Sequence, residues 1–472
     1  MNVKELQYVY FVGIGGIGMS ALARYFNFLG KKVVGYDKTP SKLTSEIAAE
    51  GISIHFEDSI ENIPIDIRTS INNQHVLVIY TPAVPSDSNE LTYFKENNFT
   101  VMKRSQALGL IIKNKRGIAI AGTHGKTSVT TTTTHLLRQS TLGCSAFLGG
   151  ISKNYNTNFL FSAESEYVVV EADEYDRSFH QLFPEIALIT AMDADHLDIY
   201  GTHEAVKESF YQFISQITTG GTLLIKYGLD ISPVKEILER HAVKVFTYSM
   251  DNTSSDFHAT NIRKQSGYYL FDIKTPSGTI QDITFNLPGP VNIENSVAAA
   301  AISWNTGMQD QFIASGLASF IGVRRRFDFY LKTNDIVFLD DYAHHPEEIK
   351  ASIVAIKDFY PGKKVTVVFQ PHLYSRTQDF AAEFAQSLSL ADELILLEIY
   401  PARELPIPGV TSKIIFDNVT LDNKILIEKT SLVEHLKNCK IEVLITMGAG
   451  DIDNYIGSIK ELLSSRLNKS CC

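Results

Sequence analysis

Twice along this chain, an apolar strand-like run passes through a glycine-rich turn into a helical pattern. The first unit runs from Tyr8–Val12 through four glycines, and the second runs from Ile118–Ala121 into Gly122–Thr127. Strands this apolar are typical of a parallel sheet that is covered by helices on both faces. The repeated unit therefore predicts an α/β protein.

The chain has 472 residues, which is long enough for several domains. A third set of apolar strands follows in the last third of the chain, at Ile336–Leu339, Lys364–Phe369, Glu393–Leu397 and Val443–Thr446. The stretch from Tyr268 to Phe285 resembles antiparallel hairpins. We predict three domains, over residues 1–113, 114–320 and 321–472.

Composition limits the classes of partner and location. The net charge of −10 argues against nucleic-acid binding, which usually needs a basic face. No apolar run of about 18 residues predicts membrane insertion, and no signal peptide is recognisable, so we expect a cytoplasmic protein. Cys144 and Cys439 stand alone, without zinc-ligand spacing, and Cys471 and Cys472 are expected to form a frayed tail. The oligomeric state stays open, with a homodimer as one alternative.

The second glycine turn carries the strongest local signal. Backbone N–H groups of such a loop can surround a phosphate, and the following helix adds its dipole. Lys126 can reach the terminal phosphates, and the hydroxyl of Thr127 can bind Mg²⁺. Ile120 occupies the position where a full Walker A loop has its first glycine. We predict an ATP-binding loop, with a plain strand-to-helix turn as the alternative, comprising Gly122, Thr123, His124, Gly125, Lys126, Thr127 and Ser128.

The first glycine turn is a weaker signal. It fits a dinucleotide fingerprint, with Asp37 about twenty residues further on as a ribose partner. Either NAD or a UDP-sugar would suit such a turn, and tight strand–helix packing is the plain alternative. The candidate residues for the nucleotide diphosphate are Gly15, Gly16, Ile17, Gly18 and Asp37.

Two acidic clusters follow apolar strands in the central part of the chain. Val168–Val170 leads into Glu171, Ala172, Asp173 and Glu174, and Ile189–Thr190 leads through Asp193 and Asp195 to His196. Carboxylates and an imidazole at strand ends beside a phosphate loop are suitable ligands for a hard cation such as Mg²⁺. Solvated loop acids are the alternative.

Further polar motifs flank the predicted third domain. Asn292 and Asn295 are three residues apart, so both amides can face one side of a helix's first turn. Arg324–Arg326 could stabilise negative charge near a phosphate, although a charge run is usually a solvated face. Arg376, which follows the strand ending at Phe369, could bind a carboxylate.

Taken together and in this order, these stretches closely resemble the Mur ligases. The resemblance runs nearly end to end, through GIGGIGMSALA, TPAVP, GTHGKTS, EADEYDRSF, DADHLDIYGT, PGPVNIEN, RRRFD, DDYAHHP, FQPHLYSRT, EIYPARELPIPGV and MGAGDI. It implies a Rossmann-like N-terminal domain for the UDP-substrate, a central P-loop-type ATPase domain and a Rossmann-like C-terminal domain that brings the amino acid.

The resemblance also implies roles for single residues. Lys126 matches the phosphate-loop lysine, and Thr127, Glu171 and His196 match the magnesium site. Asn292 and Asn295 match asparagines near adenine and the phosphates. The remaining matches are the C-terminal pair that reaches ATP, Arg326 and Asp341, and the residues for the incoming amino acid, His372 and Arg376.

The implied reaction is the ATP-dependent joining of L-alanine to the carboxylate of UDP-N-acetylmuramate through an acyl phosphate, in peptidoglycan precursor synthesis. Alternatives are a ligase that recycles whole murein peptides, an NAD-dependent dehydrogenase and a non-enzymatic P-loop switch. Three positions depart from the family. Many relatives have a histidine and an arginine where this chain has Val291 and Leu373. Tyr211 lies at the spacing of a carbamylated lysine of sister ligases, so we expect no carbamylation.

Overall fold

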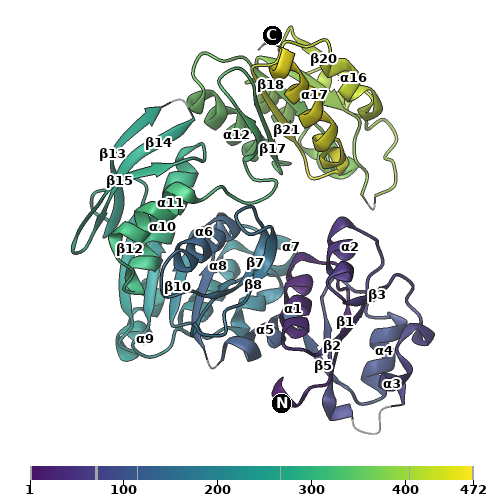
Figure 1. Ribbon diagram of the computed structural model, residues 1–472, viewed down its shortest axis with the longest axis vertical. Coiled ribbons are helices and arrows are strands. Elements are labelled where there is room, and N and C mark those ends of the chain that lie inside the picture. The colour runs from purple at the N-terminus through teal and green to yellow at the C-terminus, as the bar shows by residue number, and fades with distance from the viewer. Residues whose placement is uncertain (1–2, 70–72, 114, 266, 403, 470–472) are drawn as a thin grey trace. The chain divides into compact units, whose positions relative to one another are not determined.

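The structure, a computed structural model, describes residues 3–69, 73–113, 115–265, 267–402 and 404–469 (Figure 1). Its strands form three separate sheets, one in each third of the chain. The prediction of an α/β fold with three domains is confirmed. Cys471 and Cys472, and the predicted boundary at Asn114, lie outside the described residues.

The first sheet is parallel and has the order β3-β2-β1-β4-β5. Val9 and Phe11 pack with one layer of helices, and Tyr10 and Val12 pack with the other, because alternate residues of a strand face opposite sides. The strands are β1 (Tyr8–Val12), β2 (Lys32–Tyr36), β3 (Ser53–His55), β4 (Val76–Tyr80) and β5 (Thr100–Lys103). The first layer holds α1 (Ile17–Phe28), α2 (Lys42–Ala49) and α5 (Arg104–Ile112), and the second holds α3 (Ile65–Arg68) and α4 (Asn89–Glu96).

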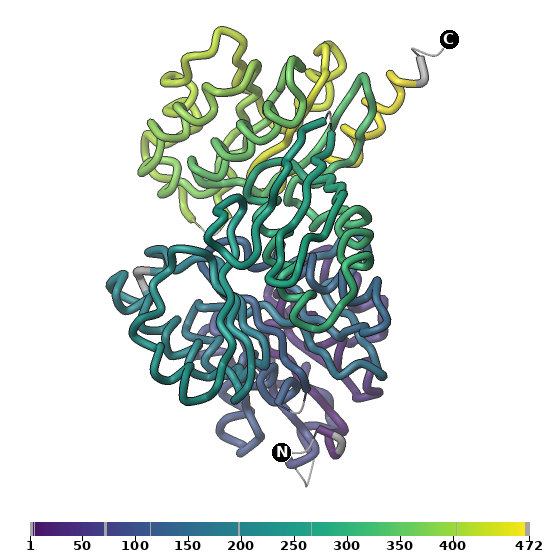
Figure 2. Tube along the Cα trace, turned by 90° about the vertical axis from the view of Figure 1, so that its left-hand side faces the viewer, coloured from purple at the N-terminus to yellow at the C-terminus, as the bar shows by residue number. Residues whose placement is uncertain are grey.

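The second sheet has the order β15-β14-β13-β12-β11-β10-β6-β9-β7-β8. Its core is parallel, and β13 to β15 extend it as consecutive strands that can be followed in teal in Figure 2. The strands are β6 (Arg116–Ala121), β7 (Ser145–Ser152), β8 (Thr157–Leu160), β9 (Tyr167–Glu171), β10 (Ile186–Ile189), β11 (Thr222–Lys226), β12 (Lys244–Ser249), β13 (Phe257–Gln265), β14 (Tyr268–Thr275) and β15 (Gly278–Phe285). The helices are α6 (Lys126–Arg138), α7 (Leu197–Tyr200), α8 (His203–Ile214), α9 (Lys235–Arg240), α10 (Pro290–Asn305) and α11 (Asp310–Ser319).

The order of this sheet decides where the predicted motifs meet. β6 lies between β10 and β9, and all three strands are parallel. The phosphate loop follows β6, the first acidic cluster follows β9, and the second follows β10. Because parallel strands end at the same edge, the three segments come together there.

The third sheet has the order β16-β17-β21-β18-β19-β20, with only β16 antiparallel to its neighbour. The strands are β16 (Asp328–Lys332), β17 (Val337–Asp341), β18 (Val365–Phe369), β19 (Glu393–Leu397), β20 (Lys424–Ile427) and β21 (Val443–Met447). The helices are α12 (Pro346–Phe359), α13 (Tyr374–Asp379), α14 (Ala381–Leu388), α15 (Lys413–Phe416), α16 (Leu432–Leu436) and α17 (Ile456–Lys469). Short 3-10 helices are η1 (Val3–Glu5), η2 (Ile60–Asn62), η3 (Asn73–His75), η4 (Tyr175–Gln181), η5 (Ser232–Val234), η6 (Lys429–Ser431) and η7 (Asp451–Tyr455).

By packing, the chain separates into two compact units. One comprises Met1–Thr260, Asp272–Gln281 and Glu294–Leu317, and the other comprises Asn261–Phe271, Asp282–Ile293 and Ala318–Cys472. The first sheet and strands β6 to β12 of the second thus share one unit, whereas β13, β14 and β15 are divided between the two units. The predicted domain boundaries stay predictions. Within the described part of the chain, no helix combines the length and apolar character needed to cross a membrane.

Candidate active site

The phosphate loop joins β6 to α6 in a conformation that only glycine adopts easily. Gly122 has a φ of +131°, and a Cβ there would overlap the hydroxyl of Thr190. Gly125 has a φ of +80° and lies at the start of α6, where no side chain caps the helix. The first N–H groups of α6 are therefore directed at the loop, as an anion site requires.

The other loop residues divide into anchored and exposed ones. The hydroxyl of Thr123 contacts Asp193, at 3.4 Å, and the backbone oxygen of His124 accepts a hydrogen bond from Thr190. The side chain of His124 is 73% exposed, whereas Thr127 is buried and Ser128 is half-buried. The backbone of the loop is thus fixed to the sheet, and only His124 extends fully into solvent.

Lys126 is held by two protein groups. Its Nζ donates to the backbone oxygen of Gly122 and to Oε1 of Glu174, each at 2.7 Å. Glu174 is 1% exposed, and burial raises the pKa of its carboxyl group, while Lys126 acts in the opposite direction. The sequence singled out the acidic cluster, but it did not indicate that Glu174 is the partner of the lysine.

Glu171 lies beside the loop from the end of β9. Its Oε1 accepts a hydrogen bond from the Thr127 hydroxyl at 3.1 Å. A Cβ at Gly149 would overlap the carboxylate of Glu171, so this position of β7 needs a glycine. The structure therefore brings Thr127 and Glu171, both predicted metal ligands, into contact. Gly149 is a supporting residue that sequence reasoning missed.

A group of side chains next to the loop has the chemistry of a cation site. Ligand atoms of Glu174, Asp195 and His196 lie within 4.8 Å of one another. His196 Nε2 is 3.9 Å from Glu174 Oε1, and Oε2 of Glu174 is buried with no hydrogen-bond partner among the described residues. Two carboxylates and an imidazole are a donor set that fits Mg²⁺. The predicted pair of Glu171 and His196 remains a prediction, and the geometry adds Glu174 and Asp195 to it.

The two asparagines lie in the first two turns of α10. Oδ1 of Asn295 would lie 2.9 Å from a Cβ at Gly125, so this amide packs against the phosphate loop. Nδ2 of Asn292 donates to the backbone oxygen of Pro288 at 2.7 Å. Val291, in the place of the family's histidine, is 62% exposed.

The first glycine turn is shaped by two charged side chains. Asp37 accepts a hydrogen bond from the N–H of Gly15 at 2.7 Å, and a Cβ at Gly15 would lie 2.8 Å from that carboxylate. A Cβ at Gly18 would lie 2.6 Å from Nη1 of Arg104. Gly16 precedes Ile17, the first residue of α1, and cannot cap the helix because glycine has no side chain. The structure thus adds Arg104, at the start of α5, to the predicted residues of this turn.

Arg104 and its neighbour connect this turn to the central sheet. Arg104 forms an ion pair with Asp173 at 2.9 Å, and Lys103 forms one with Asp176 at 2.8 Å. Both acids belong to the segment Glu171–Asp176, which we call the acidic loop. This loop therefore contacts the phosphate loop directly and reaches the first glycine turn through Arg104.

In the C-terminal domain, the three consecutive arginines differ in their environment. Arg325 contacts Asp340 at 3.3 Å and the backbone oxygen of Gly448 at 2.5 Å, so it stabilises this domain. Arg326, the predicted catalytic arginine, is exposed. Asp341 accepts hydrogen bonds from the N–H groups of Phe327 and Ala343, at 3.0 and 2.9 Å, and burial raises its pKa to about 6.

His372 and Arg376 lie at the carboxyl end of β18. The ring of His372 stacks on that of Tyr400, with centroids 5.8 Å apart. Burial, followed by the nearby charge of Arg376, lowers the pKa of His372. His372 Nδ1 and Arg376 Nη1 are buried polar atoms without hydrogen-bond partners among the described residues. Leu373 between them has a φ of +72°, a conformation that is strained for a leucine.

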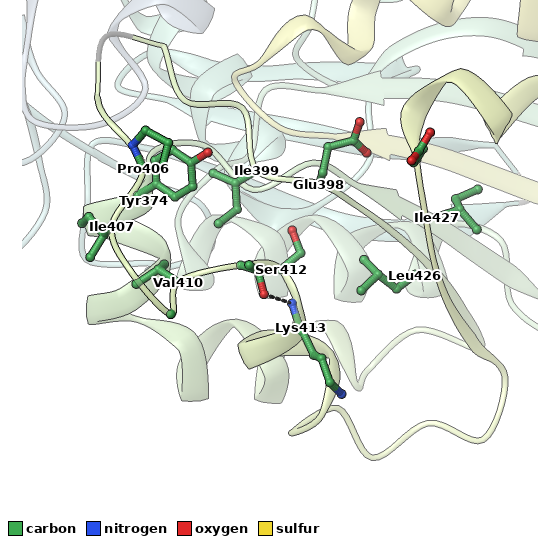
Figure 3. Close-up of a pocket in the computed structure, with 13 residues that line it drawn as sticks. Tyr374, Glu398, Ile399, Pro406, Ile407, Val410, Ser412, Lys413, Leu426 and Ile427 are labelled. Atoms are coloured by element: carbon green, nitrogen blue, oxygen red, sulfur yellow. Dashed lines mark hydrogen bonds between the residues drawn. The ribbon is translucent and has the colours of Figure 1, made fainter.

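A pocket of 540 Å³ lies nearby, at the ends of β19 and β20 (Figure 3). Ile399, Val410 and Leu426 give it apolar walls, and Glu398 and Lys413 lie at its margin. Tyr374, which also lines it, stands between His372 and Arg376 in the sequence. The pocket therefore adjoins the segment predicted to bind the amino acid.

Family models match along almost the whole chain. The Mur ligase family catalytic domain matches residues 8–116, the Mur ligase middle domain matches residues 120–303, and the Mur ligase glutamate ligase domain matches residues 325–452. The chain belongs to the Mur ligase family. The family's three models follow the order of the three sheets.

Relatives of this Mur ligase are similar over their full length. The UDP-N-acetylmuramate–L-alanine ligase of Phocaeicola vulgatus is 53% identical over 467 residues, which cover 99% of this chain and 100% of that protein. The crystal structure of the UDP-N-acetylmuramate-alanine ligase of Thermotoga maritima has a TM-score of 0.80 at 25% identity, and covers 97% of this chain and 99% of its own. A murein peptide ligase from Psychrobacter arcticus, at 20% identity, shares the fold with a TM-score of 0.65, over 97% of this chain and 98% of its own.

Proposed function

We propose that this Mur ligase joins L-alanine to the carboxylate of UDP-N-acetylmuramate, with cleavage of ATP to ADP and phosphate. One observation carries the proposal: the 53% identity, over essentially the whole chain, to a ligase named for this reaction. The assembled phosphate loop and the buried acidic groups beside it supply the chemistry that such a reaction needs. The predicted cytoplasmic location belongs to the same proposal.

ATP would bind with its phosphates at the start of α6. The N–H groups of residues Gly122–Ser128 would surround the phosphates, and Lys126 would reach the terminal one. Asn295, which packs against Gly125, would position the nucleotide together with Asn292. The catalytic set of this proposal is Lys126, Glu171, His196, Arg326 and Asp341.

The reaction brings two anions together. The muramoyl carboxylate must approach the γ-phosphate, and at about 4 Å two unit charges repel by roughly 4 kcal/mol at an effective dielectric of 20. Bound Mg²⁺ would supply charge neutralisation at the phosphates. Thr127, Glu171 and His196 would hold it, and Glu174 and Asp195 offer further oxygen ligands in the same place.

The carboxylate oxygen would attack the γ-phosphate to give an acyl phosphate and ADP. The amine of alanine would then attack the acyl carbon, and phosphate would leave as the amide forms. Lys126 and Arg326 would stabilise the negative charge on the transferred phosphoryl group.

The two other substrates would occupy the outer domains. The diphosphate of the UDP-substrate would lie at the turn formed by Gly15, Gly16, Ile17 and Gly18, at the N-terminus of α1. Arg376 would bind the carboxylate of alanine. His372 would lie beside the incoming amine, and its lowered pKa keeps the ring neutral and able to accept a proton.

The decisive experiment measures phosphate release and new amide in one reaction. The protein is given ATP, Mg²⁺ and UDP-N-acetylmuramate with single amino acids or with a murein tripeptide, and the products are identified by mass spectrometry. We expect ADP, phosphate and the alanyl product only when alanine is present. Turnover with the tripeptide but not with alanine would instead favour the peptide-recycling ligase, and a Lys126→Met variant with normal turnover would contradict the role of the phosphate loop.

A further inference from the structure

The phosphate-loop lysine has two hydrogen-bond partners within the protein. An ammonium group has three N–H donors. Two of those of Lys126 are used by the protein, for Oε1 of Glu174 and for the backbone oxygen of Gly122. A phosphate that binds in the loop must therefore compete with Glu174 for this lysine.

The geometry makes Glu174 a strong competitor. The carboxyl group is 1% exposed, and its ion pair with Lys126 is 2.7 Å long, with only 14% of the lysine side chain exposed. Water screens such a pair poorly. Two further ion pairs of the acidic loop, from Asp173 and Asp176, involve side chains that are 22 to 41% exposed.

We propose that Glu174 is a positioning residue: it holds Lys126 inside the phosphate loop and gives the lysine up to the phosphates when the nucleotide binds. The proposal rests on the proposed nucleotide role of this loop. It goes further, because it gives a function to a glutamate outside the predicted catalytic set.

Release of Lys126 leaves a buried carboxylate that needs a new partner. His196 Nε2 is 3.9 Å from Glu174 Oε1, close enough to form a hydrogen bond after a small side-chain movement. Within the part of the chain that the structure describes, Oε2 of Glu174 has no hydrogen-bond partner. Glu174 therefore sits between two possible partners, Lys126 on one side and His196 on the other.

The matched test compares charge removal at two acids beside the same loop. Glu174→Gln removes the carboxylate that contacts Lys126. Asp193→Asn removes an equal charge near Thr123 and His124, from a side chain that is 68% exposed. A general electrostatic effect on a bound polyanion would appear in both variants, whereas competition for Lys126 would appear only in the first.

Binding of the non-hydrolysable analogue AMP-PNP is measured by calorimetry with EDTA present, so that no divalent cation contributes. We expect Glu174→Gln to bind it about tenfold more tightly than the unmodified protein, because one charge-assisted contact no longer has to be broken. Asp193→Asn should change the affinity less than about twofold, since its charge is exposed and screened.

A double-mutant cycle separates positioning from other effects. In a Lys126→Met background, Glu174→Gln should no longer tighten binding. Glu174→Asp keeps the charge but shortens the side chain, so its affinity should lie between those of the unmodified protein and Glu174→Gln, and it serves if Glu174→Gln folds poorly.

Three results would overturn the proposal: unchanged or weaker AMP-PNP binding in both Glu174 variants, equal tightening in Asp193→Asn, or tightening that persists without Lys126. Failure of the proposed function is a different result. In that case the unmodified protein would not bind AMP-PNP, and Lys126→Met alone would change nothing.

Discussion

The buried pair of Lys126 and Glu174 makes a prediction about stability that does not depend on substrates. Lys126→Met removes the charge of the lysine but keeps most of its aliphatic stem. Glu174 then stays buried, at 1% exposure, without a cation in contact. We expect the unliganded variant to be clearly less stable than the unmodified protein.

The magnitude follows from the geometry of the pair. Two unit charges 2.7 Å apart attract by roughly 6 kcal/mol at an effective dielectric of 20, and the cost of desolvation offsets part of this. Removing one partner of a buried pair typically costs about 3–5 kcal/mol. Screening of the pair is weak but not absent, because 14% of the Lys126 side chain is exposed. We therefore expect a value at the lower end of this range, about 3 kcal/mol.

Thermal unfolding of the unliganded protein at pH 8 measures this effect. A loss of about 3 kcal/mol corresponds to a fall in Tm of roughly 6–12 °C for a cooperative unit of this size. Lys226→Met is the matched control, because Lys226 pairs with Glu294 at 2.8 Å in the same unit, but with side chains that are 41% and 20% exposed. Its cost should stay below about 1 kcal/mol.

The pH dependence of the stability lost in Lys126→Met gives a second check. Burial raises the pKa of Glu174 in the folded protein, and without Lys126 this pKa rises further. A carboxyl group with a raised pKa binds its proton more tightly in the folded state, so stability falls as the pH rises from the unfolded pKa to the folded one. The difference in Tm between Lys126→Met and the unmodified protein should therefore be smaller at pH 5 than at pH 8.

The reasoning fails if Lys126→Met melts within about 2 °C of the unmodified protein, which corresponds to less than about 1 kcal/mol. It fails equally if adding Glu174→Gln to Lys126→Met recovers none of the lost stability. In either case the carboxylate would not depend on the lysine.

Further predictions concern activity. Asp341 has a raised pKa of about 6, so its carboxylate loses its charge as the pH falls through that value. In steady-state assays, the kcat/KM of the unmodified protein should therefore fall below pH 6, whereas that of Asp341→Asn should not change with pH in this range. Gly149→Ala displaces the carboxylate of Glu171, so Mg²⁺ titrations of turnover should show a higher requirement and a kcat reduced at least about tenfold. Gly15→Ala meets Asp37 at 2.8 Å, whereas Gly278→Ala, in β15, meets no atom within 4 Å. Only Gly15→Ala should raise the KM for the UDP-substrate strongly.

Much of the site could be predicted because its parts are local in the sequence. The loop Gly122–Thr127 needs glycine conformations that a short motif specifies, and Asp37 follows the strand next to the first glycine turn. Glu171 ends the buried strand β9, and His196 lies in the loop that follows the buried strand β10. A strand that leads into a polar turn places such residues at one edge of a parallel sheet.

Other features depended on contacts between distant segments. The sequence pattern does not distinguish Arg325 from Arg326. In the structure, Arg325 contacts Asp340 and Gly448, whereas Arg326 is exposed. Arg104 contacts Asp173 across 69 positions of the sequence. No spacing rule pairs residues so far apart.

The sequence by itself determined the α/β fold, the order of the glycine turns and the residues able to bind phosphates, because periodicity and glycine conformation are properties of short segments. Only the tertiary structure decided that Glu174, rather than Glu171, holds Lys126. Both glutamates follow the same strand, three residues apart. Burial and the parallel arrangement of β9, β6 and β10 determine which carboxylate faces the lysine. Burial and strand order both depend on how segments distant in the sequence pack together, so the sequence pattern alone does not specify them.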